Sequence, residues 1–191
     1  KFYNDESVTI GDMLNEKIAT IGENMNIRRF ERFEGVVEAY IHGGGRIGVL
    51  VNFKVADGAK AATAEFKEYA RDIAMQIAAA NPLFLNKDAV PTDTLDKEKE
   101  ILMAQAINEG KPQAIAEKMV NGRIAKYYKE VCLIEQAFIK DQEKNITDYT
   151  KEVAAKLGSD IEIVAFTRFE KGEGIEKRED DFANEVANMV K

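Results

Sequence analysis

Three glycines form the pattern in this sequence that comes nearest to a nucleotide-binding loop. Gly43, Gly45 and Gly48 match G-x-G-x-x-G, which holds a pyrophosphate when a strand precedes the loop and a helix follows it. Residues 49–53 are an apolar run containing two valines, and this composition favours a strand instead. The glycines are better explained as a hairpin turn that requires positive φ. A nucleotide-binding enzyme stays open as an alternative, which titration with labelled nucleotide would test.

The other candidates for catalysis are one histidine, one cysteine and dispersed acids. His42 is the only histidine, which excludes a histidine-rich metal centre and leaves a single base for a hydrolytic triad. No G-x-S-x-G motif supplies a serine, and the apolar context of Cys132 favours a structural role. The acidic pairs have the spacing of solvated faces. We therefore predict a protein that is not an enzyme, with no catalytic residue, metal or cofactor, and with His42 exposed to a partner.

The glycine turn is expected to join two strands over residues 36–42 and 46–55. An amphipathic helix follows, with Phe66, Ala70, Ile73 and Ile77 on one face, and it should stop at residues 81–82, Asn-Pro. Residues 95–109 predict a further helix that ends at Gly110.

A second long helix is predicted from Pro112, in its first turn, to about residue 130. The two long helices could form a projecting antiparallel pair or lie flat on the sheet, and the sequence leaves both arrangements open. Residues 131–139 then indicate a strand, and residues 180–190 a terminal helix.

A unit of helix followed by strand occurs twice. Each predicted helix begins at a capping residue and stops at a glycine, Thr9 and Gly22 in the first copy and Asn145 and Gly158 in the second. Strands are expected at 27–33 and 161–169. At a constant offset of 136 residues, identical amino acids include the pairs Ile10/Ile146, Asp12/Asp148, Ile27/Ile163, Phe30/Phe166, Arg32/Arg168 and Phe33/Phe169.

This duplication predicts an α+β fold of two related subdomains, each an antiparallel sheet packed with helices. A helix and one strand cannot bury their apolar faces alone, so each copy needs further strands. The hairpin supplies them to the second copy only. We therefore expect residues 1–35 to be the end of a truncated first subdomain, and the chain to be a fragment. Residues 36–191 would form the second subdomain, with a helical hairpin insertion around residues 93–157.

Composition narrows the class of partner. The chain has 191 residues, 27 basic and 34 acidic side chains and a net charge of −7 with the signs mixed, so no nucleic acid or membrane partner is expected. No apolar run approaches the roughly 20 residues that span a bilayer. A single cysteine is consistent with a reducing cytoplasm.

Several segments together resemble the bacterial elongation factor Ts family, in order and over nearly the whole chain. They are residues 17–30, 40–51, 72–79, 117–123 and 168–177. The resemblance implies a guanine-nucleotide exchange factor for elongation factor Tu, located in the cytoplasm, with a homodimer among its expected assemblies. It also implies that a Thr-Asp-Phe-Val segment, absent from this sequence, precedes the matching region. The fragment is therefore expected to be a poor exchange factor.

By the same resemblance, the residues that contact the partner correspond to His42, Arg46, Ile47, Gly48 and Gln76. Many family members have histidine at the position of Gln76. The resemblance also pairs residues 114–130 with residues 146–157 as the projecting helical hairpin. The alternative from another class is a non-catalytic helical scaffold or dimerisation module with other partners, which a pull-down from cytosol would separate.

Overall fold

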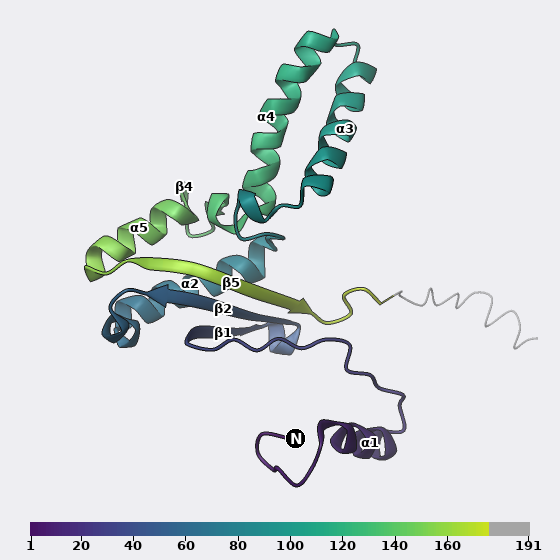
Figure 1. Ribbon diagram of the computed structural model, residues 1–191, viewed down its shortest axis with the longest axis vertical. Helices are drawn as coiled ribbons and strands as arrows, with labels where there is room; N and C mark the ends of the chain where they lie inside the picture. The colour runs from purple at the N-terminus through teal and green to yellow at the C-terminus, as the bar shows by residue number, and fades with distance from the viewer. Residues whose placement is uncertain (176–191) are drawn as a thin grey trace, which may run out of the picture. The chain divides into compact units, whose positions relative to one another are not determined.

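The computed structural model describes residues 1–175, which fall into two compact units that are treated separately below (Figure 1). The first unit is residues 1–32, and the second begins at Phe33. The subdomain boundary expected after residue 35 stays a prediction. The helix predicted over residues 180–190 lies outside the described residues.

The helical half of the duplicated unit is confirmed. α1 (Ile10–Ile21) is capped by the Thr9 side chain and ends at Gly22, whose φ is 80°. α5 (Ile146–Leu157) is capped by the Asn145 side chain and ends at Gly158, whose φ is 63°. Both helices have 12 residues and an aspartate in the first turn, where a carboxylate is favoured by the helix dipole.

The strand half is confirmed in the second copy only. β5 (Ile161–Glu170) is a strand, whereas residues 27–33 have no regular secondary structure. The prediction at 27–33 was wrong because a strand needs a hydrogen-bonded neighbour, and no strand in the described residues pairs with this segment. Propensity alone does not form a ladder.

The second unit is built on an antiparallel sheet in the order β1-β2-β5. The predicted hairpin is confirmed: β1 (Val36–His42) pairs with β2 (Ile47–Val55), starting one residue later than expected. Gly43, Gly44 and Gly45 form the turn with φ of 59°, 65° and 93°, values that only glycine adopts easily. β5 pairs with the other side of β2, although it lies more than 100 residues away in sequence.

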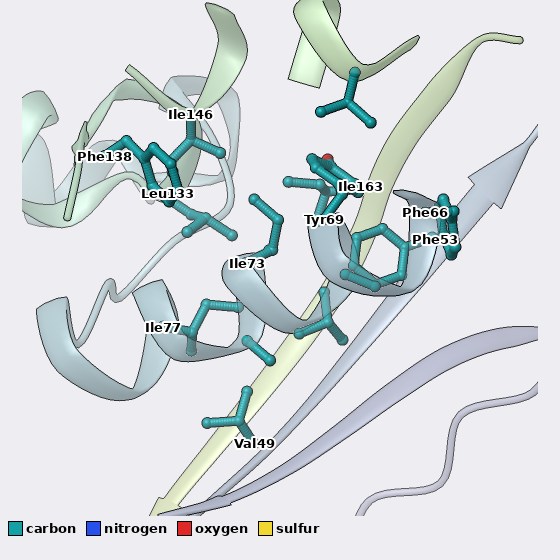
Figure 2. Close-up of a cluster of buried hydrophobic side chains, with 14 of the residues drawn as sticks. Val49, Phe53, Phe66, Tyr69, Ile73, Ile77, Leu133, Phe138, Ile146 and Ile163 are labelled. Atoms are coloured by element: carbon teal, nitrogen blue, oxygen red, sulfur yellow. The ribbon is translucent and has the colours of Figure 1, made fainter. Parts of the chain in front are cut away.

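Helix α2 (Ala64–Ala80) packs on one face of this sheet and closes the main core (Figure 2). Its N-cap is Thr63, and it ends at Asn81 in the left-handed conformation with φ 46°, directly before the proline, as predicted. α5 also contributes to this core. The residues buried most completely by the packing include Val51, Tyr69, Ile73, Ile77, Leu133 and Ile146.

The long helices α3 (Thr92–Asn108) and α4 (Gln113–Val131) lie side by side and extend away from the sheet (Figure 1). The projecting antiparallel pair is therefore confirmed, but its members are α3 and α4. The pairing of 114–130 with 146–157 was wrong, since α5 packs on α2, where the Tyr69 and Tyr149 rings are 5.5 Å apart. A small core of Ala106, Ala116, Val120 and Ile124 joins the pair.

The strand predicted over residues 131–139 is also wrong. Val131 ends α4 and Leu133–Glu135 form a 3-10 turn. Within this stretch only Ala137–Phe138 (β3) form a strand, which pairs with β4 (Asp141–Asn145). Tertiary contacts explain the difference: the Val131 carbonyl accepts hydrogen bonds from the backbone of Leu83 and Phe84, which ties this segment to the root of the hairpin. The helical insertion therefore spans 92–131 and not the whole of 93–157.

Candidate docking site at the glycine hairpin

The end of β1, the start of β2 and the last turns of α2 surround a pocket of about 450 Å³. Apolar side chains make most of its lining, and three polar residues complete it. The apolar residues are Ile47, Met75, Ala78, Ala79 and Ile139, and the polar ones are Tyr40, His42 and Arg168. An apolar hollow with a few polar groups is the usual composition of a site that binds another molecule.

His42 is held in this pocket by its neighbour on the same face of β1. The Tyr40 hydroxyl and His42 Nδ1 are 2.9 Å apart, a hydrogen bond, and the two ring centroids are 5.9 Å apart. Arg71 of α2 places its guanidinium carbon 4.7 Å from the centre of the Tyr40 ring, a cation-π contact. Because Nδ1 is occupied by Tyr40, Nε2 is the ring nitrogen that His42 can offer to a partner.

An ionic cluster borders the pocket on the β5 side. Arg168 Nη2 donates to Glu170 at 2.8 Å, and Arg46 Nη2 donates to the same carboxylate at 3.1 Å. These hydrogen bonds, first that of Arg168 and then that of Arg46, hold the pKa of the Glu170 carboxyl below its usual value. The Arg168 side chain is 11% exposed, whereas that of Arg46 is 70% exposed. Arg46 is thus the cation that a docking molecule would meet first.

Ile139 reaches the pocket because two side chains of α2 hold its loop. Gln76 Oε1 accepts the backbone N–H of Ile139 at 2.9 Å. One turn earlier, Asp72 Oδ1 accepts from Lys140 Nζ at 2.6 Å, while the Tyr149 hydroxyl donates to Asp72 Oδ2 at 3.0 Å. Burial, and then the nearby Asp72 carboxylate, raise the pKa of Tyr149, so this hydroxyl stays a donor well into alkaline solution.

The structure brings together only part of the predicted contact set. His42 and Ile47 face one another across the hairpin and line the same pocket, with Arg46 beside them in the turn. Gly48 pairs with Ile41, so it lies on the opposite face of the sheet. Gln76 is 0% exposed, and its side-chain amide is hydrogen-bonded to Gln136 and to the backbone of Ile139. It therefore holds a residue that lines the pocket and presents no surface to a partner.

The predicted contact set omitted six residues that line the pocket: Tyr40, Met75, Ala78, Ala79, Ile139 and Arg168. Tyr40 could have been found, since it precedes His42 by two positions and a strand repeats its facing every two residues. Met75, Ile139 and Arg168 come from other elements, and only the tertiary packing brings them to the hairpin. No local signal in the sequence marks them.

The arrangement supports docking better than catalysis. The glycine loop leads into β2, not a helix, so the dinucleotide interpretation of Gly43, Gly45 and Gly48 is excluded. Among residues 1–175, no cluster of three histidine, cysteine, aspartate or glutamate side chains could hold a metal ion. Within the same range, every helix is too short or too polar to cross a membrane.

The fold and the pocket define a class of protein. It is an α+β protein in which a helical hairpin projects from a core of antiparallel sheet and helices. The comparisons narrow that class. The family described as Elongation factor TS matches residues 1–173. The chain therefore belongs to the elongation factor Ts family.

Two relatives show the extent of the likeness. Elongation factor Ts from Clostridium botulinum (strain Loch Maree / Type A3) is 54% identical over 193 aligned residues, covering 100% of this chain and 62% of the relative. Elongation factor Ts from Clostridium kluyveri (strain ATCC 8527) has the same identity and coverage. The chain thus spans 62% of the length of these relatives.

Proposed function

We propose that this chain is part of a guanine-nucleotide exchange factor for elongation factor Tu, acting in the cytoplasm during translation. The observation that carries the proposal is the family match across residues 1–173, which includes every residue of the pocket at the glycine hairpin. His42, Arg46 and Ile47 are the contact residues of this proposal, and Ile139 and Met75 join them as the apolar surface.

Exchange of this kind needs no covalent chemistry. A protein that binds the nucleotide-free GTPase more tightly than the GDP-bound form must weaken GDP binding by the same factor, because the coupling between two ligands is reciprocal. Each tenfold weakening of GDP corresponds to about 1.4 kcal/mol of coupling free energy. A docking surface is sufficient for this, and the pocket at the glycine hairpin is the surface that we propose.

The test is the rate at which fluorescent GDP leaves elongation factor Tu. The full-length protein should accelerate release until the rate saturates, with GDP and protein unchanged chemically. This chain alone should bind the nucleotide-free GTPase and accelerate release far less. An unchanged GDP off-rate at saturating full-length protein would refute the proposed function.

The pocket can be tested within the same assay. His42→Ala should weaken binding to nucleotide-free elongation factor Tu by about tenfold, since a truncated hot-spot residue commonly costs more than about 1 kcal/mol. Lys54→Ala, at the exposed far end of β2, is the matched control and should bind as before. Equal affinities for both variants would remove His42 from the contact surface.

A homodimer is a second element of the proposal. The face of the sheet turned away from α2 presents Val37, Ala39 and Ile41 of β1, and Ile41 is 66% exposed. A second copy could cover this face, because antiparallel sheets pack well on one another through apolar side chains. Sedimentation would show a dimer that Ile41→Glu converts to a monomer. An identical mass for both proteins would argue against this assembly.

The alternative of a general helical scaffold is separated by its partners. A scaffold would retain other cytosolic proteins through α3 and α4 and would leave GDP release unchanged. A pull-down in which elongation factor Tu is lost on His42→Ala supports exchange instead, because His42 lies on the sheet and not on the helical pair α3 and α4.

A further inference from the structure

Two buried glutamines connect the pocket to the root of the helical hairpin. Gln76 Nε2 donates to Gln136 Oε1 at 3.1 Å and to the carbonyl of Ala137 at 3.2 Å. Gln136 Nε2 donates to the Glu130 carbonyl at 2.8 Å and to that of Ala80 at 3.5 Å. Gln76 is 0% exposed and Gln136 is 4% exposed.

One end of this amide pair holds the pocket. Gln76 Oε1 accepts the N–H of Ile139, whose side chain lines the hollow beside His42. Residues 75, 78 and 79, which flank Gln76 on α2, supply three further lining side chains. The hydrogen bond between Gln76 and the Ile139 N–H thus holds Ile139 close to the α2 residues that line the pocket.

The other end holds the hairpin. Glu130 lies in the last turn of α4, where carbonyl groups lack partners within the helix, and Gln136 caps one of them. The backbone N–H of Leu133 donates to the Phe84 carbonyl in the same region, which joins the segment before α3 to the segment after α4. The Gln136 side chain that binds Gln76 therefore also binds the last turn of α4, beside the backbone bonds of Val131 and Leu133.

Separating Gln76 from Gln136 is unfavourable in free energy. Each amide makes three hydrogen bonds, and in the described part of the chain every buried side-chain nitrogen and oxygen has a partner. A hinge movement that separated the glutamines would leave buried amide groups without hydrogen-bond partners, which is unfavourable because such groups lose their hydration with nothing in return. A fully satisfied buried polar network of this kind favours one arrangement.

We propose that Gln76 and Gln136 are positioning residues that lock the pocket wall and the helical hairpin into one rigid surface for a single partner. This inference rests on the proposed function for the identity of the partner, elongation factor Tu. Gln76 acts through Ile139, and Gln136 acts through the last turn of α4. Neither glutamine touches the partner.

The first arm of the test needs no partner. In Gln76→Met, a substitution of similar volume, the Ile139 amide loses its acceptor, so its hydrogen exchange should accelerate at least tenfold over the unchanged protein. Gln142→Met, at an exposed position of β4, is the control and should leave this exchange rate as it was. An unaltered Ile139 exchange rate in Gln76→Met would overturn the proposal.

The second arm is a double-mutant cycle on binding to nucleotide-free elongation factor Tu by the full-length protein. Gln76→Met and Ile139→Ala should each weaken binding about tenfold, and the double variant should be no weaker than Ile139→Ala alone, because Gln76 acts through Ile139. Effects that multiply would overturn the proposal, since a general loss of stability would act independently. If the unchanged protein fails to bind, the proposed function fails, while the exchange measurement still decides whether Gln76 positions Ile139.

Gln136→Met tests the same proposal at the helical hairpin. Spin labels at exposed positions 54 and 111, on β2 and at the tip of the hairpin, should show one narrow distance distribution in the unchanged protein. The distribution should broaden in Gln136→Met and stay narrow in Gln142→Met. Equally narrow distributions in all three proteins would overturn the role of Gln136.

Discussion

His42 and Ile47 are the last paired residues of the β1–β2 hairpin, and both side chains line the same pocket. Three glycines with positive φ close the turn between them. The turn therefore decides which residue stands opposite His42, and a shift of one position would replace Ile47 by a residue facing the other side of the sheet.

Gly44→Ala tests this turn. The φ of Gly44 is 65° and a Cβ atom there would meet nothing within 4 Å, so the cost is conformational and not a clash. We expect the free energy of unfolding to fall by about 1–2 kcal/mol, the cost of a non-glycine residue in the left-handed region. Urea unfolding measures it, and an unchanged midpoint would contradict the role assigned to the turn.

Gly122→Ala should have the opposite effect. Gly122 lies inside α4 with ordinary helical φ and open space where a Cβ would go. Alanine in a helix interior is favoured over glycine by about 0.8–1.0 kcal/mol. Urea unfolding, monitored by the helical circular dichroism signal, should therefore show that the helical hairpin is more stable in this variant. A loss of stability would contradict the prediction.

Ile73→Ala should be among the most damaging core substitutions. Ile73 is 0% exposed and belongs to the buried hydrophobic cluster that α2 helps to form (Figure 2). Truncating such a side chain removes buried apolar area and leaves a cavity, a loss of about 2–5 kcal/mol. Ile101→Ala, at a site 52% exposed on α3, should change thermal stability little, so similar losses in both variants would refute this account.

Acid should weaken the link between α5 and β4. Hydrogen bonds from Lys144, and then from Lys156, lower the pKa of Glu152 to about 2 from its ordinary 4.5. A depressed pKa in the folded state means that this stabilisation is fully present above pH 4.5 and is lost as the pH falls toward 2. The thermal unfolding midpoint of Lys144→Met should vary less steeply with pH between pH 4.5 and pH 2 than that of the unchanged protein. A slope equal to that of the unchanged protein would contradict the prediction.

Local signals in the sequence were sufficient for the elements that carry their own end markers. Thr9 with Gly22, and Asn145 with Gly158, each delimit a helix because a cap and a left-handed glycine act within a few residues. The hairpin at the three glycines was predictable for the same reason. The antiparallel pairing of β1 and β2 follows from a turn that short.

Features that depend on distant segments were not predictable. Residues 27–33 have the composition of a strand but no described strand beside them, and residues 131–139 are divided by the bonds of Val131 to the chain before α3. β4 was missed because its polar sequence has none of the usual strand residues. For the site, Ile47 was named only through the family resemblance and His42 was also singled out as the one histidine, whereas the burial of Gln76 beside Gln136 depends on tertiary packing.

Cys132 gives the junction between α4 and the core a built-in chemical reporter. It is 0% exposed beside the Glu130 carbonyl that Gln136 caps, it is the chain's one thiol, and burial raises its pKa. An alkylating reagent can reach the sulfur only when this junction transiently opens, because the reactive thiolate is both shielded and disfavoured. The rate at which the thiol is alkylated should therefore report how often the junction opens. A bound partner that stabilises the junction should lower this rate.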